Sequence, residues 1–200
     1  MAKYTKIAAD TFKKLQLNAG ILCTTFAPAT ATVDDASILA ATSGGVNFTA
    51  TPSFTDFGED IDNCPKNTME LKRLDSWEVK ISGTAVSVDT KTAKSFIAMA
   101  DVASTKVTPR NDLKTSDFAD LWWVGDYSDV NVDGGSTSGT KAGFIAIHML
   151  NALSTGGFQL QTADKEKGTF SFEYTAHYSM DAQDTVPFEV YISPATPAGK

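Results

Sequence analysis

Two stretches of the chain alternate polar and apolar residues, and this alternation constrains the fold more than any other feature of the sequence. Residues 76–88 read SWEVKISGTAVSV, and residues 169–178 read TFSFEYTAHY. Successive side chains of a β-strand leave opposite faces, so each stretch predicts a strand with one buried face. The apolar faces carry Trp77, Val79 and Ile81 in the first stretch and Phe170, Phe172 and Tyr174 in the second.

The rest of the chain continues this β-rich pattern and adds one helix. Residues 143–150, GFIAIHML, are apolar on both faces and predict a strand that is covered on both sides, by its own core and by either the same chain or a neighbouring subunit. Residues 90–102 predict the helix, because their apolar residues recur at helical spacing and Asp89 before them is a suitable N-cap. Shorter strands are predicted over residues 46–54, 118–124, 157–161 and 187–192.

These elements predict a mainly β fold, a β-sandwich or barrel of about seven to eight strands with one packed α-helix and a long loop. A chain of 200 residues has the length of one large domain, and we interpret residues 1–200 as one. Two long connections interrupt the strands, over residues 55–75 and 125–140. Compact domains rarely keep about twenty residues without regular structure unless those residues have a function. The first connection is therefore a candidate functional segment.

The composition is that of a folded globular protein with an acidic surface. Hydrophobic residues make up 42% of the chain, charged residues 20%, and the formal net charge is −7. A protein that grips nucleic acid clusters Lys and Arg, and no such cluster lies outside the first fourteen residues. Cys23 and Cys64 do not make a disulfide framework and predict reduced thiols. Polar residues interrupt the apolar run 15–27, which argues against a signal peptide, and no stretch has the length of a transmembrane helix.

Catalytic motifs find little support in the sequence. The two histidines, His148 and His177, both fall within predicted strands, and no Gly-x-Ser-x-Gly nucleophile motif is present. Glycine pairs lack the spacing and the lysine of a phosphate-binding loop. Carboxylates are abundant and therefore do not single out a catalytic pair, although a hydrolase with an acid pair stays an alternative. We predict that the chain is not an enzyme and uses no cofactor.

A short run in the second connection resembles half of a calcium-binding loop. Asp129, Asn131, Asp133 and Gly134 have the spacing of the first half of an EF-hand, but position twelve is Thr140, where a bidentate Glu is expected. The same composition makes a good hairpin turn. We favour the turn and predict no metal site. A calcium-dependent β-sandwich carbohydrate-binding module stays the alternative function.

Adjacent tryptophans, Trp122 and Trp123, must point to opposite faces of their predicted strand. Both indoles therefore cannot enter the same core. Tryptophan is enriched at protein interfaces, so these two residues are candidates for a subunit contact. The alternative is that the helix or a loop of the same chain covers one of them. In the alternative function, one of them would stack on a sugar.

Nearly the whole chain resembles one family, the major tail proteins, or tail tube proteins, of long-tailed phages with non-contractile tails. Prophage and tailocin relatives of these proteins look similar. The residues that carry the resemblance are KLQLNAGIL at 14–22, ATSGGVNFTATPSFTDFGEDIDNCPKNTMELKRLDSWEVKISGT at 41–84, TPRNDL at 108–113, DLWWVGDYSD at 120–129 and FSFEYTAHYSMDAQDTVPFEVYI at 170–192. These stretches show overall likeness and include no catalytic signature.

The resemblance implies a structural virion protein that assembles with itself. Such proteins form hexameric rings that stack into a hollow tube, through which the genome enters the host. It implies an N-terminal arm within residues 1–40, an inter-ring loop over residues 55–75 and a C-terminal tail over 193–200. The candidate contact residues of that loop are Asp56, Glu59, Asp60, Asp62, Leu71, Lys72 and Arg73.

The resemblance also implies the partners and the location of the protein. The partners are other copies of the chain and the tape measure, tail tip and tail terminator proteins, with no membrane insertion. The protein is expected in the virion tail, after assembly in the host cytoplasm. DNA passes through the lumen without specific binding, and we expect acidic walls to repel it and let it slide.

Overall fold

The computed structural model describes residues 7–8, 11–127 and 143–193 of the chain. They form eleven strands, one α-helix and four short 3-10 turns. The elements are β1 (Gln16–Cys23), β2 (Ile38–Ala40), β3 (Thr42–Asp56), β4 (Lys72–Ala85), α1 (Thr90–Ile97), β5 (Ala100–Ala103), β6 (Lys106–Pro109), β7 (Ala119–Tyr127), β8 (Phe144–Ser154), β9 (Gln159–Gln161), β10 (Thr169–Thr175) and β11 (Phe188–Ser193).

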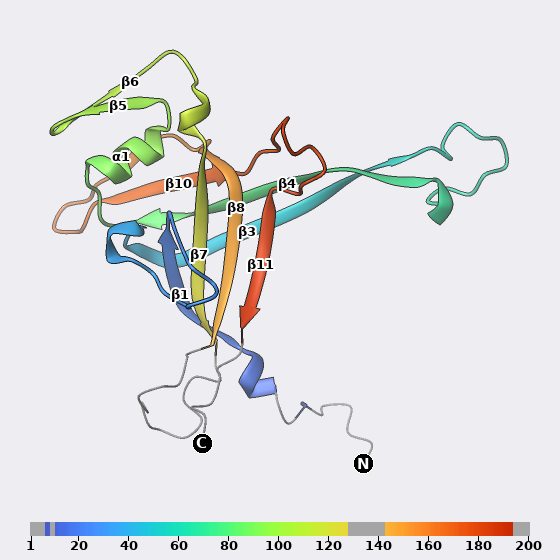
Figure 1. Cartoon of the computed structure of the whole chain (residues 1–200), viewed down its shortest axis with the longest axis horizontal. Coiled ribbons are helices and arrows are strands. Elements are labelled where there is room, and N and C mark those ends of the chain that lie inside the picture. The colour runs from blue at the N-terminus through green and yellow to red at the C-terminus, as the bar shows by residue number, and fades with distance from the viewer. Residues whose placement is uncertain (1–6, 9–10, 128–142, 194–200) are drawn as a thin grey trace.

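Nine of these strands belong to one antiparallel sheet, which bends so that its strands form two layers that cross at a steep angle. Its order is β2-β1-β7-β8-β10-β4-β3, with β11 paired to β8 and β9 paired to β10. Strand β8 pairs with β7 and β11 along most of its length, and its end pairs with β10 through Leu153 and Ser154. In Figure 1, β1, β7, β8 and β11 run steeply across the direction of β3, β4 and β10. The predicted fold class, mainly β with one helix, is confirmed.

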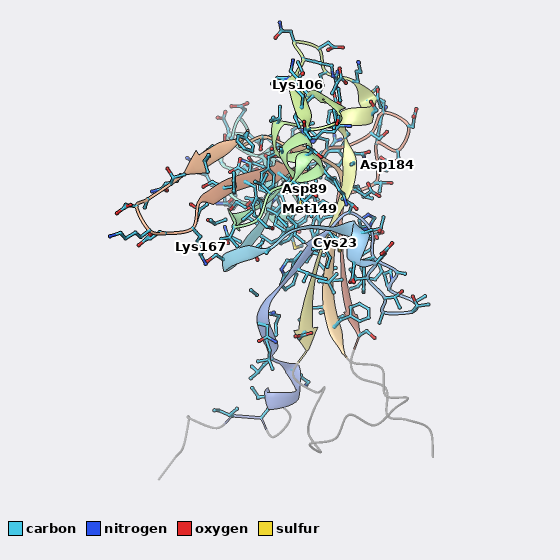
Figure 2. The ribbon with its side chains drawn as sticks, turned by 90° about the vertical axis from the view of Figure 1, so that its left-hand side faces the viewer. Cys23, Asp89, Lys106, Met149, Lys167 and Asp184 are labelled. Carbon is cyan, nitrogen blue, oxygen red and sulfur yellow. The ribbon has the colours of Figure 1, made fainter. Side chains whose placement is uncertain are left out.

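The main hydrophobic core lies between these two crossing layers. The predicted apolar faces of β4 and β10 enter it, with Val79, Ile81, Phe172 and Tyr174 buried. Leu22, Leu121 and Met149 meet them from the other layer. Figure 2 shows Met149 near the middle of the molecule, whereas Lys106 and Lys167 lie at its periphery. The period-two alternation therefore identified the buried face of both strands correctly.

Helix α1 closes one side of this core. The carboxylate of Asp89 accepts a hydrogen bond from the Thr92 amide at 2.7 Å, which confirms the predicted N-cap. Phe96 is fully buried, and its ring stacks on Phe172 at a centroid distance of 5.7 Å. The helix ends at Ile97, earlier than predicted, because Ala98 takes a backbone conformation with φ 64° and the chain turns into β5.

A second, smaller core covers the opposite face of β1, β7 and β8. Cys23, Trp122 and Phe144 form it, and Phe26 and Val33 from the connection between β1 and β2 pack onto it. Strand β8 is thus covered on both sides, as its sequence predicts, and both covers come from this chain. Burial raises the pKa of the Cys23 thiol to about 11, so this thiol stays protonated at neutral pH.

Several predicted boundaries were wrong. The described residues hold more strands than the seven or eight expected, because β2, β5 and β6 are too short to show a period. Strand β1 was missed since Asn18 (φ 64°) and Gly20 (φ 71°) interrupt its alternation. It makes part of the predicted N-terminal arm a member of the sheet. Strand β10 ends at Thr175, so His177 follows the strand instead of lying within it.

Replacing Phe96 tests how much the helix contributes to the core. Phe96→Ala should lower the free energy of unfolding by about 3–5 kcal/mol, because a fully buried aromatic side chain leaves a cavity between α1 and β10. Urea denaturation followed by tryptophan fluorescence measures this loss. Phe96→Leu is the matched control and should cost clearly less. Equal stability of Phe96→Ala and the unmodified protein would contradict this description of the core.

Candidate functional site

The end of the β3–β4 hairpin projects from the body of the molecule. Strand β4 pairs with both β3 and β10 from Lys80 to Ala85, but from Lys72 to Ser76 its only described strand partner is β3. Trp77 is the point at which β4 is last held to the body of the molecule. Its amide donates to the Tyr178 hydroxyl at 2.9 Å, and its ring packs on Phe188. We call residues 54–75, beyond this anchor, the arm. Figure 1 shows it extending far to the right of both layers.

The arm contains more regular structure than the sequence predicted. Residues 55–75 were expected to lack it, yet β3 continues to Asp56 and β4 begins at Lys72, which face each other in register. The loop proper is therefore residues 57–71, with a 3-10 turn at Met69–Leu71. A register shift between Ser53 and Phe54 breaks the two-residue period, which explains why the sequence pattern hid the strand ends.

Hydrogen bonds within the loop hold the arm tip in one shape. The Asp56 carboxylate accepts bonds from the backbone amides of Gly58 and Asn67, each at 2.9 Å. These two bonds hold the pKa of Asp56 below its ordinary value. Gly58 is buried, and a Cβ at this position would lie 3.0 Å from the Cys64 Sγ atom. The chain thus passes close to itself at this point, and a larger residue would push the loop open.

The predicted contact residues fall into two groups on the arm. At its tip, Glu59, Asp60 and Asp62 are exposed. At its base, the Lys72 ammonium donates to the Asn67 side-chain oxygen at 3.3 Å and lies 5.1 Å from the centre of the Phe54 ring. Leu71 is half-buried, whereas Arg73 is exposed, paired with Thr55 across the hairpin. Asp56 and Lys72 therefore shape the arm, while the tip acids and Arg73 face outward.

Sequence reasoning missed the apolar side chains of the arm. Five large ones are substantially exposed: Phe54 (50%), Phe57 (56%), Ile61 (50%), Met69 (79%) and Leu74 (44%). They are spread singly among acidic and polar residues, so no periodic pattern marked them. The signal that could have found them is that several large apolar residues occur together in a segment outside the core. The exposed apolar residues of this segment are therefore candidates for an interaction surface.

The two tryptophans point to opposite sides of β7, as predicted, and the chain itself covers much of both. Trp122 is buried in the second core, stacked on His148 at a centroid distance of 3.9 Å. Its ring face is therefore not open to a sugar. Trp123 packs against the main core, and its indole nitrogen donates to the Ala19 carbonyl at 3.0 Å. Their role in a subunit contact stays a prediction.

The described histidines lack the arrangement of a hydrolytic site. Both ring nitrogens of His148 face carboxylates, with Nε2 at 3.0 Å from Asp120 and Nδ1 at 3.5 Å from Glu189. Neither nitrogen is therefore free to activate a hydroxyl or a thiol. The Nδ1 atom of His177 lies 3.2 Å from the carbonyl of Asn151. Among the described residues, no group of three or more His, Cys, Asp or Glu side chains could hold a metal ion.

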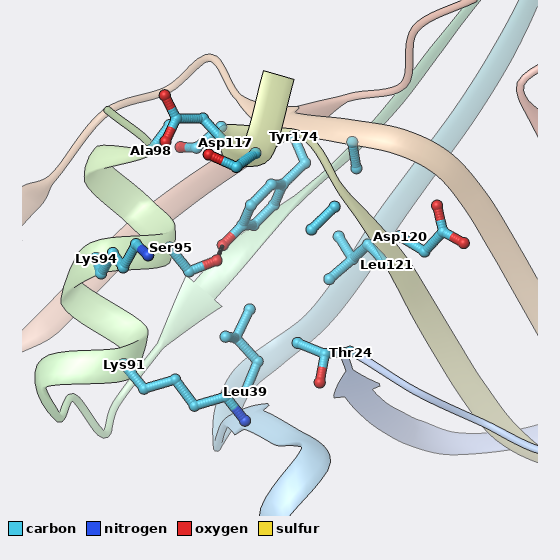
Figure 3. A pocket seen from close by; sticks show the side chains of 14 residues that line it. Thr24, Leu39, Lys91, Lys94, Ser95, Ala98, Asp117, Asp120, Leu121 and Tyr174 are labelled. Atoms are coloured by element: carbon cyan, nitrogen blue, oxygen red, sulfur yellow. Dashed lines mark hydrogen bonds between the residues drawn. The ribbon is translucent and has the colours of Figure 1, made fainter. Parts of the chain in front are cut away.

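A pocket of about 180 Å³ lies between α1 and β7 (Figure 3). Its walls are mainly apolar, and at one side the hydroxyls of Ser95 and Tyr174 meet at 2.6 Å. Ligand pockets usually measure about 300–1,000 Å³, so this one is small. The calcium-like run Asp129–Asp133 lies outside the described residues. No described helix has the length and apolar character needed to cross a membrane.

Asp56→Asn tests the origin of the loop's shape. The amide oxygen can still accept one backbone bond, but its nitrogen cannot accept the second, so amides in residues 57–71 should exchange with solvent faster. A lowered folded pKa stabilises the loop above the unfolded pKa, and this contribution is lost as pH falls through the folded value. The difference between variant and unmodified protein should therefore disappear in acid.

Hydrogen exchange measured by mass spectrometry over a pH series checks this expectation. Asp60→Asn is the matched control, because it removes the same charge from an exposed position on the same loop. The melting temperature should stay unchanged in both variants, since the arm lies outside the core. Equal exchange in the two variants would show that the Asp56 hydrogen bonds do not order the loop.

No protein-family profile and no curated protein matches the chain. Among the solved structures that are weakly similar to it are two from gene transfer agent particles. One is the tail of an empty gene transfer agent particle with C6 symmetry, at a TM-score of 0.41 and 8% identity, covering 80% of this chain and 92% of the other. The other is the virion of a native gene transfer agent particle, at a TM-score of 0.41 and 7% identity, covering 88% and 95%. At these values the likeness carries no argument about the fold or the function of this chain.

Proposed function

We propose that this chain is the tail tube protein of a phage-like tail, which assembles into hexameric rings that stack into a tube. The observation that carries the proposal is the arm, an ordered ribbon with exposed apolar residues at its end. The sequence resemblance to tail tube proteins supports the same function. In this proposal the protein acts through assembly and catalyses no reaction.

The arm has the physical character of a docking element. A two-stranded ribbon is at best marginally stable alone, so one that projects from a body is expected to gain stability from a further contact. Phe57, Ile61 and Met69 are the exposed large apolar residues of its loop, and docking them against a neighbour would remove their surface from water. The chain would also supply the surface that receives them, so the contact joins unlike patches of identical subunits.

Contacts between unlike patches propagate. A heterologous contact produces a ring when its rotation closes and a filament when it does not. In the proposed tube, contacts within a ring close, while the arm reaches the next ring and continues the stack. The loop acids and Arg73 would then orient the docked arm by charge. Charged residues at the edge of an interface favour the correct register more than they add affinity.

The remaining parts of the proposal follow from this assembly. The partners are other copies of the chain, together with the tape measure, tail tip and tail terminator proteins. The lumen conducts DNA into the host without specific binding. The protein would be made and assembled in the host cytoplasm and would reside in the virion tail.

Tube formation by variants of the arm tests the proposal. The unmodified protein, concentrated and aged, should form hollow stacked rings that negative-stain electron microscopy detects. Phe57→Asp and Ile61→Asp should each abolish or strongly reduce the stacks, because a charge in a desolvated contact lacks a partner. Both variants should keep the melting temperature of the unmodified protein, since these side chains lie outside its core.

Two controls sharpen this test. Val102→Asp makes the same change at a similarly exposed residue of the β5–β6 hairpin and should leave the stacks intact. Arg73→Glu examines charge at the arm, and is cleaner than Lys72→Glu because Lys72 also bonds within the arm. A protein that stays monomeric even with its tail tip partner contradicts the proposed function. Stacks formed equally well by Phe57→Asp and Ile61→Asp exclude the arm as the inter-ring contact.

A further inference from the structure

We propose that the outer face of strands β3, β4 and β10 is the wall that faces the lumen of the tube. This inference rests on the proposed function and identifies the surface that DNA would pass. The face consists of every second residue of the three strands, from Asn47 to Ser53, from Ser76 to Thr84 and from Ser171 to Thr175. We call it the hydroxyl face.

Its composition differs from that of an ordinary protein surface. Of its twelve side chains, eight are Ser or Thr. Cross-strand pairing sets them in rows, with Ser171 opposite Thr84 and Thr51 opposite Glu78. The opposite side of the same strands carries the apolar residues of the main core. The alternation of polar and apolar residues therefore separates a buried face from a solvent-exposed one, as expected for a sheet with one face in water.

The hydroxyl face is an unsuitable surface for subunit contacts. None of the exposed large apolar side chains of the described residues lies on it. These side chains lie elsewhere, for example on the arm, at Val190 and Ile192 of β11, and at Phe158 and Leu160 around β9. Interface cores are rich in aromatic residues, Met and Arg and poor in Ser. A hollow tube leaves two surfaces of each subunit in water, the lumen wall and the outer wall, and this face fits one of them.

The charges of the face suit the passage of a polyanion. Its ionisable side chains are Glu78, Lys80 and Glu173, and the Lys80 ammonium forms an ion pair with the Glu78 carboxylate. No arginine is present on it, so a phosphate group would find no unpaired cation there. Binding of DNA to proteins depends on phosphate contacts by Lys and Arg. The face therefore has little to hold DNA.

In this proposal the lumen wall carries less negative charge than the acidic walls expected from the net charge of the chain. The acids of the described chain lie largely elsewhere, including the arm tip and the residues around Arg110, where Asp101, Asp112 and Asp117 gather. Hydroxyl groups form short-lived hydrogen bonds that water replaces easily. Free passage of DNA would then come from weak, replaceable contacts and a small negative charge instead of strong repulsion.

Cysteine labelling of assembled tubes tests the inference. Thr49→Cys and Ser171→Cys place thiols on two strands of the face, and Lys106→Cys on β6 is the control away from it. All three are made with Cys64→Ser, while Cys23 is buried and stays unreactive. Each variant is treated, as monomer and as tube, with N-ethylmaleimide and with a maleimide that carries a bulky polyethylene glycol chain. Melting temperatures confirm that the monomers are folded.

A lumen wall gives a distinctive pattern. In monomers, both reagents should label all three cysteines. In tubes, Thr49→Cys and Ser171→Cys should lose labelling by the bulky reagent but keep labelling by the small one, which can diffuse along the lumen, and Lys106→Cys should keep labelling by the bulky reagent.

Other patterns overturn the inference in distinguishable ways. Labelling of the face by both reagents in tubes would place it on the outer surface, and loss of both would place it in a subunit contact. Failure of the two face variants to form tubes, while Lys106→Cys forms them, would also indicate a contact. Absence of tubes with Cys64→Ser and with the unmodified protein overturns the proposed function and this inference with it.

Discussion

The structure depends on the unequal partnering of strand β4. Over Lys80–Ala85 this strand is hydrogen-bonded on both edges, to β3 and to β10, and its inner side chains lie in the main core. Beyond Trp77 its only described strand partner is β3, and neither core of the described residues includes a residue of the arm. One continuous hairpin is therefore rigid where it belongs to the body and exposed where it becomes the arm. Because backbone pairing continues across this transition, the body sets the direction of the arm.

The same strands separate three environments by side-chain periodicity. Inner residues of β4 and β10 pack against α1 and β8, and outer residues form the hydroxyl face. The register shift after Ser53 then ends this strict alternation at the start of the arm. A single bulge thus marks the point at which the hairpin changes from a two-faced sheet to a ribbon with apolar residues exposed. Bulges commonly mark such changes in strand direction and pairing.

The sequence predicted those parts of the fold that follow a regular residue pattern or a local capping rule. The buried faces of β4 and β10, the cap at Asp89 and the divided orientation of Trp122 and Trp123 all follow from local rules and are present in the structure. Strand β1 and the ends of the hairpin were missed because irregular backbone at Asn18, Gly20 and the bulge removes the period. At the candidate site, the length of the connection singled out residues 55–75, and their role in a contact stays a prediction. The apolar residues there could not be recognised as exposed without knowing that the core ends at Trp77.

The internal order of the arm bears on how it could dock. A loop of fifteen disordered residues would lose much backbone entropy on binding, at roughly 1–2 kcal/mol for each residue fixed. The bonds of Asp56 to the Gly58 and Asn67 amides and the contact of Lys72 with Asn67 and Phe54 fix part of this loop before any contact forms. Preorganisation of this kind raises affinity without adding contacts. Because a stack repeats the same contact at every ring, a small gain per subunit would recur along the whole tube. The hydrogen bonds inside the arm would then matter for assembly as much as the apolar side chains that it presents.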